Sequence, residues 1–186
     1  MVKVGFICEG DTEKIIIESD SFKIFFKENN LQFVKALDAT GNGNLLPKNI
    51  TPFINNLLEE GVEKIFILTD LDEDRCITKT KERISAPSNI IVIIAVKKIE
   101  SWFLADSNTL SLIFKENFSV ENFENELDPR QVLKELFLKK TNRGIGDSKP
   151  LFAKRMINNG FSIPNAALHP NCLSAQYFIS KLLSIG

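Results

Sequence analysis

The sequence predicts an α/β fold in which a parallel sheet is flanked by helices and followed by a helical C-terminal extension. Three observations support this. Short apolar runs alternate with segments of helical periodicity through the first 106 residues. The run at residues 90–96 is apolar throughout, as in a strand that is buried on both faces. Beyond residue 100 the patterning is mostly helical. We therefore expect an α/β core over residues 1–106, with residues 107–186 packed on it.

The individual elements follow from local signals. Strands are expected where mostly apolar runs end in polar or glycine-containing turns, at residues 2–8, 31–37, 64–69 and 90–96. Helices are expected at residues 11–27, from Pro47 to Gly61, at 73–84, 100–106, 129–140, 150–158 and 174–185. Asp11 or Thr12 can cap the first helix, and Pro47 suits the first turn of the second. Alternation of this kind, with right-handed crossovers, predicts a Rossmann-like sheet.

Composition excludes several classes of protein. The 186 residues carry 23 Lys/Arg and 24 Asp/Glu, so the chain cannot coat nucleic acid by bulk charge, and any such contact must be local. Three scattered cysteines without paired spacing indicate neither a disulfide framework nor a zinc ribbon. No apolar run is long enough to span a bilayer, and residues 1–10 lack the apolar stretch of a signal peptide. We expect a cytoplasmic protein without a membrane partner.

Carboxylates follow two of the expected strands. Glu9 closes the first, and Asp70 and Asp72 follow the third. Ligand sites in open parallel sheets lie outside the carboxyl ends of the strands. Alternate residues of an extended segment point the same way, so we expect Asp70 and Asp72 to face one crevice and Leu71 to point away.

Grouped acids of this kind need compensation. Two carboxylates about 5 Å apart repel by roughly 3 kcal/mol at an effective dielectric constant near 20. Shared protons, Lys/Arg partners or a divalent cation could offset this repulsion, and an all-oxygen ligand set suits Mg²⁺ or Mn²⁺. The plainer alternative for each acid alone is a turn residue or a helix cap.

Several short motifs resemble one family. Glu9-Gly10-Asp11-Thr12-Glu13 resembles the E-G-x-T-E signature of TOPRIM domains, and Asp70-Leu71-Asp72-Glu73-Asp74 resembles their D-x-D motif. TOPRIM is the metal-binding module of topoisomerases, bacterial primases and overcoming-lysogenization-defect (OLD) nucleases. Residues 98–106 look like the E-x-W-x-L-A-D element of a bacterial TOPRIM-like family of unknown function, number 4276. Residues 170–178 are similar to the C-terminal motif of that family.

The resemblance implies roles for particular residues. Glu9 matches the TOPRIM glutamate that acts as general base or acid, and Glu13 matches a second glutamate of the OLD-like pattern. Asp70 and Asp72 match Mg²⁺ ligands, and Glu9, Asp74 and Glu100 could join them. Lys97 could touch the scissile phosphate or pair with Glu100.

The activity implied is nuclease-type phosphodiester hydrolysis that depends on Mg²⁺ or Mn²⁺, with phage defence as its setting. Related stand-alone TOPRIM proteins are often encoded beside an ATPase. Since this chain has no P-loop motif, the resemblance suggests a separate P-loop ATPase partner. The alternative function is a non-catalytic interaction module of an ATPase complex.

The expected partner is nucleic acid, and DNA is favoured over RNA. Binding its phosphates would need a local basic surface. The densest supply of cations is Lys139, Lys140, Arg143, Lys149, Lys154 and Arg155. A solvated helical face is the alternative for this group. A topoisomerase is not expected, because the only tyrosine, Tyr177, lies in an amphipathic helix where a packing role is favoured.

Overall fold

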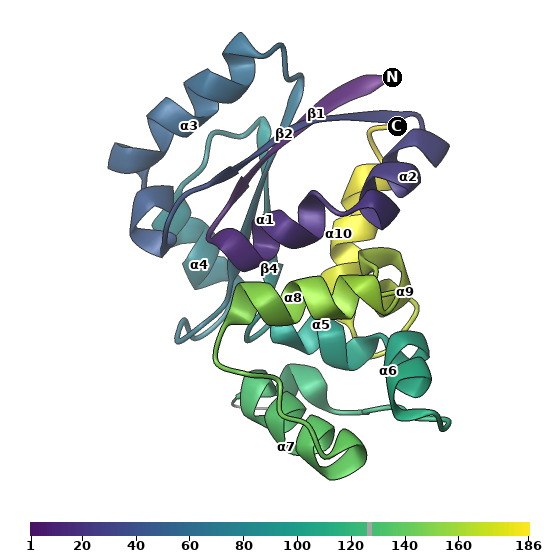
Figure 1. Cartoon of the computed structure of the whole chain (residues 1–186). Helices are drawn as coiled ribbons and strands as arrows, with labels where there is room; N and C mark the ends of the chain where they lie inside the picture. Colours follow the sequence, from purple (N-terminus) through teal and green to yellow (C-terminus); the bar gives the residue numbers. More distant parts are fainter. Residues whose placement is uncertain (126–127) are drawn as a thin grey trace.

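A four-stranded, all-parallel sheet in the order β2-β1-β3-β4 forms the centre of the molecule (Figure 1). The computed structural model describes residues 1–125 and 128–186. The strands are β1 (Val2–Cys8), β2 (Leu31–Asp38), β3 (Lys64–Asp70) and β4 (Ile90–Ala95). Each lies where its sequence pattern predicts a strand, and the predicted α/β class with a helix-flanked parallel sheet is confirmed.

The helices of the first half differ from expectation in two places. They are α1 (Asp11–Ile17), α2 (Asp20–Glu28), α3 (Pro47–Glu59) and α4 (Ile77–Ile84), with a 3₁₀ turn, η1, at Asn42–Leu45. The single helix expected over residues 11–27 is two helices, because Ser19 is extended and its side chain caps α2 by accepting a hydrogen bond from the Phe22 amide. α4 begins at Ile77 rather than at residue 73, since a turn follows β3.

The second half is helical, as expected. It contains α5 (Glu100–Ala105), α6 (Ser107–Phe114), η2 (Phe123–Asn125), α7 (Pro129–Thr141), α8 (Lys149–Asn158), α9 (Ile163–Ala167) and α10 (Leu173–Leu183). α6 and α9 were not predicted. α6 starts directly after α5 because the buried carboxylate of Asp106 accepts hydrogen bonds from the amide and hydroxyl of Thr109 (2.9 and 2.8 Å). No helix within the described ranges is both long and apolar enough to cross a bilayer.

Two hydrophobic clusters cover the two faces of the sheet. One face packs against α3 and α4 through residues such as Leu57 and Ile84. The other face packs against α1, α2 and the helices that follow β4. Phe178 of α10 lies with its ring centroid 6.0 Å from those of Phe6 and Phe66, so residues distant in sequence share one cluster. Of the helices after β4, α10 therefore packs on this face of the sheet, and α8 packs on α1 (Figure 1).

Candidate functional site

Acidic side chains gather at the carboxyl edge of the sheet, around a pocket of about 560 Å³. Its lining includes Glu9 after β1, Glu13 of α1 and Asp70 at the end of β3. The opposite wall comes from the loop before α8 and its first turn, with Asp147, Ser148 and Lys149. The pocket is therefore built by segments from both halves of the chain.

Glu9 and Asp70 are joined by direct contacts. Oε2 of Glu9 accepts hydrogen bonds from the hydroxyl of Thr69 and from the backbone amide of Asp70, the latter at 3.2 Å. Oδ1 of Asp70 accepts a hydrogen bond from the Ile99 amide at 2.7 Å. This last bond ties the end of β3 to the start of α5, where Glu100 is the first helical residue. The acids at the ends of β1 and β3 thus converge, as their positions in the sequence predict.

Glu100 is the most deeply buried acid of the group, with 1% of its surface exposed. Its Oε1 lies 3.5 Å from Nη1 of Arg130 and 3.5 Å from Nζ of Lys149. Neither carboxylate oxygen accepts a hydrogen bond, and Oε2 has no ion-pair contact either within the described residues. A buried carboxylate oxygen without a partner is costly. Oε2 of Glu100 is therefore an acceptor that no described residue satisfies.

The pKa values of two acids report the crowding of negative charge. Burial raises the pKa of Glu13 to about 7, and the charges of Glu9 and Glu100 act in the same direction. Burial also holds the pKa of Asp70 well above its usual range, with further contributions from Glu13, Glu100, Glu9 and Asp72. At neutral pH, protons and cations therefore compete for the carboxyl groups of this cluster.

The ammonium group of Lys149 belongs to the same cluster. Burial of its ammonium group tends to lower the pKa, but Glu100, Asp70 and Glu13 more than offset this, so the pKa of Lys149 is raised. Its side chain points to the acids and lines the pocket, whereas its place in the sequence suggested a nucleic-acid surface.

Asp72 and Asp74 do not line this pocket. β3 ends at Asp70, and Asp72 has φ +48 in the following turn, so the alternation that would aim Asp70 and Asp72 together is broken. Asp72 and Asp74 line a neighbouring hollow with Arg83. Asp74 forms an ion pair with Arg83 at 3.0 Å, and the neighbouring side chains of Thr80 and Arg83 lower the pKa of Asp74. The expectation that Asp70 and Asp72 share one crevice is therefore not met in this structure.

Lys97 lies in a left-handed turn after β4, with φ +62, and its carbonyl accepts a hydrogen bond from the Asp72 amide at 3.0 Å. Its side chain does not line the pocket. The pairing with Glu100 that its position suggested is made instead by Lys149 and Arg130.

The other expected basic residues are dispersed along α7, α8 and the loop between them. Lys140 pairs with Glu116, and the guanidinium of Arg155 lies 5.0 Å from the centre of the Phe137 ring. Lys139, Arg143 and Lys154 have no ion-pair partner within the described part of the chain and are exposed. These three remain available for a phosphate backbone.

Two functional candidates were missed from sequence. Asp38, the last residue of β2, also lines the pocket, and burial together with the neighbouring carboxyl group of Asp11 raises its pKa. The signal that identified Asp70, an acid at a strand end, would have found it had the strand been extended by one residue. Arg130 carried no comparable signal, because only tertiary packing brings α7 to Glu100.

The donor set fits a magnesium ion in part. Glu9, Asp70 and Glu100 offer carboxylate oxygens, and Glu100 Oε2 lacks a partner among the residues that the structure describes. Within residues 1–125 and 128–186, no three His, Cys, Asp or Glu side chains are arranged closely enough to hold a metal ion by themselves. Mg²⁺ normally needs only one or two protein carboxylates, because it keeps several waters and also binds substrate phosphates. Asp70 and Glu100, with Glu9 beside them, meet that lower requirement.

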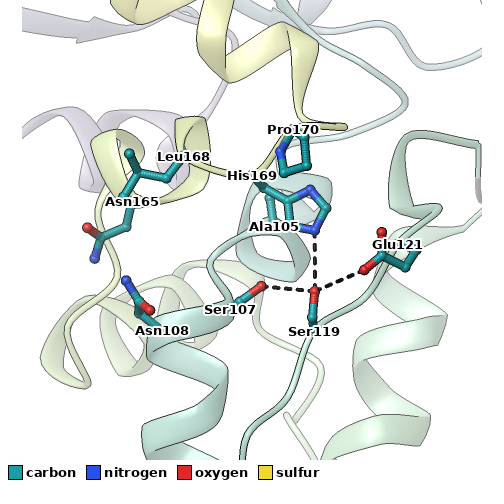
Figure 2. Close-up of a pocket in the computed structure, with 9 residues that line it drawn as sticks. All are labelled: Ala105, Ser107, Asn108, Ser119, Glu121, Asn165, Leu168, His169 and Pro170. Carbon is teal, nitrogen blue, oxygen red and sulfur yellow. Dashed lines mark hydrogen bonds between the residues drawn. The ribbon is translucent and has the colours of Figure 1, made fainter.

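A separate pocket of about 310 Å³ surrounds the only histidine (Figure 2). Nε2 of His169 lies 3.4 Å from Oγ of Ser119, the spacing of a possible nucleophile and base. Nδ1 of His169, however, accepts a hydrogen bond from the Asn171 amide at 3.2 Å, so the ring proton is on Nε2. His169 therefore donates to Ser119 and is not arranged as its general base.

The chain matches no protein-family model, no curated protein and no solved structure. The resemblance to TOPRIM domains thus rests on the sequence motifs alone.

Proposed function

We propose that this protein is a metal-dependent phosphodiesterase of the TOPRIM type that hydrolyses nucleic acid with Mg²⁺ or Mn²⁺. The observation that carries the proposal is the buried, unpartnered Oε2 of Glu100 beside Asp70 and Glu13, at the carboxyl edge of a parallel sheet. This is the edge where such sheets place their ligands. Two cations contact Glu100, while Glu9, Glu13 and Asp70 lie in the same neighbourhood, so the cluster holds more acidic than basic side chains.

The roles of the residues follow from their positions. Asp70 and Glu100 would hold the ion, with Glu9 beside them, and a bound ion would polarise a phosphoryl oxygen and lower the pKa of a water. Glu13 lines the same pocket and is placed to accept or return a proton. Lys149, on the opposite wall, would bind a non-bridging phosphate oxygen.

The test is cleavage of labelled single- and double-stranded DNA and RNA with Mg²⁺, Mn²⁺ or a chelator. We expect metal-dependent cleavage that Asp70→Asn and Glu9→Gln abolish and that Asp20→Asn, a matched change on the exposed face of α2, leaves intact. Circular dichroism should show all three variants folded. Unchanged cleavage by Asp70→Asn would refute the proposal.

The alternative, a non-catalytic module of an ATPase complex, is supported by one observation. Lys149 and Arg130 already lie at ion-pair distance from Glu100, which gives the cluster partial compensation without a metal. If this function holds, none of the four nucleic-acid substrates is cleaved, and Mg²⁺ leaves the thermal stability of the folded chain unchanged.

A further inference from the structure

The outer edge of β4 carries a groove that the proposed hydrolytic site does not use. β4 pairs only with β3. Apart from a turn bond from the Ile90 amide to Pro87, no described segment outside β3 and its continuation hydrogen-bonds to the β4 backbone. Residues 90–92 line the groove, whose volume is about 380 Å³, together with the C-terminal end of α4 and one side of α10. The groove therefore runs along the open side of an edge strand.

The walls of the groove are positively charged. Nζ of Lys81, from α4, and Nζ of Lys181, from α10, lie 5.1 and 5.3 Å from the centre of the Tyr177 ring. No Asp or Glu lines the groove, and neither lysine has an ion-pair partner in the described part of the chain. A cation–π contact at an exposed site contributes only about 0.5–1 kcal/mol, so little holds these ammonium groups over the ring.

We propose that the edge of β4 binds an extended acidic segment of a partner protein, which joins the sheet as a fifth strand. A free strand edge presents alternating N–H and C=O groups, and another peptide backbone matches both. Carboxylates on the added strand would pair with Lys81 and Lys181 and displace them from Tyr177.

Two other occupants match the groove less well. A phosphodiester backbone offers acceptors only, so it would leave the outward carbonyls of β4 unpaired. A second copy of this chain would bring its own Lys81 and Lys181 against this pair, and like charges placed together oppose association. An acidic peptide is the occupant that matches both the strand edge and the charge.

The test is fluorescence anisotropy with the full chain and a peptide of roughly seven residues, the length of an ordinary strand, in which valine and glutamate alternate and both ends are blocked. We expect saturable binding with a Kd below about 1 mM that weakens with added salt. Amide exchange at residues 90–92 should slow when the peptide binds. The same peptide with lysine in place of glutamate should not bind, and N-methylation of alternate backbone amides should weaken binding at least tenfold.

The double variant Lys81→Glu, Lys181→Glu should lose binding at least tenfold, whereas Lys139→Glu, a matched change on exposed α7, should not. Asp70→Asn should bind the peptide normally, because this proposal is independent of the hydrolytic site. Absence of saturable binding, equal binding of the N-methylated peptide, or equal binding by the double variant would overturn it. Full competition by an oligothymidylate would also overturn it and would point to nucleic acid as the occupant.

Discussion

At the scale of single residues, the central feature is the balance of charge around Glu100. Its carboxylate is almost completely buried and meets Arg130 and Lys149 only at 3.5 Å. The guanidinium of Arg130 is also committed to the carbonyls of Gly146 and Asp147, at 3.1 and 2.7 Å. Arg130 is therefore fixed, whereas Lys149, with 43% of its side chain exposed, is free to move if another cation enters.

Glu13→Gln should change the pH dependence of stability in the metal-free protein. The pKa of Glu13 is about 7 in the folded chain, against an ordinary value of 4.5. The folded state therefore binds this proton more tightly, so the contribution of Glu13 is fully present below pH 4.5 and is lost as the pH rises through 7. The glutamine variant should gain up to about 3 kcal/mol relative to the native chain across this window. Urea unfolding in a chelator, on either side of the window, measures this gain, and parallel pH profiles would contradict it.

Lys149→Met should destabilise the metal-free protein by about 1–2 kcal/mol, because it removes one of two cations from Glu100 while the lysine is only partly buried. Mg²⁺ should recover more stability in this variant than in the native chain, since the ion replaces the missing charge. Thermal unfolding with and without Mg²⁺ measures both effects. Lys154→Met, one turn further along α8, is the control. If Mg²⁺ stabilises neither protein, the proposed ion does not bind.

At the scale of elements, local patterns predicted the strands and the acids at their ends. Buried strands have short apolar runs that end in turns, and this pattern can be recognised from residues that are adjacent in the sequence. The turn after β3 was not predictable in the same way. Asp72 adopts φ +48 because its amide bonds to the carbonyl of Lys97, a contact between segments 25 residues apart in the sequence. This backbone turn, rather than residue type, separates Asp72 from Asp70.

Trp102, in the motif at residues 98–106, links two helices of the second half. Nε1 of Trp102 donates a hydrogen bond to Oγ of Ser174 at 2.8 Å, and Ser174 in turn donates to Glu124. The fully buried indole thus joins α5 to the start of α10. Glu100 is placed at the site by the same short helix that Trp102 anchors.

Gly5→Ala should destabilise the fold by about 1–3 kcal/mol through overpacking between β1 and α3. A Cβ at this position would lie 2.9 Å from a methyl carbon of Val62 and 3.0 Å from one of Leu57. Gly43→Ala, where a Cβ meets nothing within 4 Å, is the matched control. Urea unfolding compares the two variants. Equal stability would show that α3 does not pack this closely on the sheet.

At the scale of the whole molecule, the candidate site depends on both halves of the chain. The sequence predicted the acidic wall of the pocket, because parallel strands end at one edge. It did not predict the opposite wall, because Asp147 and Lys149 reach the pocket only through the packing of α8 against α1. That packing is a long-range contact. Its consequence, a lysine beside Glu100, Asp70 and Glu13, cannot be predicted from neighbouring residues in the sequence.

A shortened chain that ends at residue 106 should therefore fail to fold cooperatively. One face of its sheet would lose Phe178 and the other buried side chains of the C-terminal helices, and this would expose Phe6 and Phe66 to water. The full chain should unfold in one transition by both near- and far-ultraviolet circular dichroism. A sharp transition from residues 1–106 alone would show that the core is independent.

The proposed function depends most on a divalent ion bound among the carboxylates. The most direct measurement is a crystal structure with Mn²⁺, in which anomalous scattering locates the metal. We predict a peak about 2.1 Å from carboxylate oxygens of Asp70 and Glu100, with Glu9 alongside and Lys149 moved away from Glu100. An empty map at this edge under saturating Mn²⁺, with Lys149 still paired to Glu100, would contradict the proposed function.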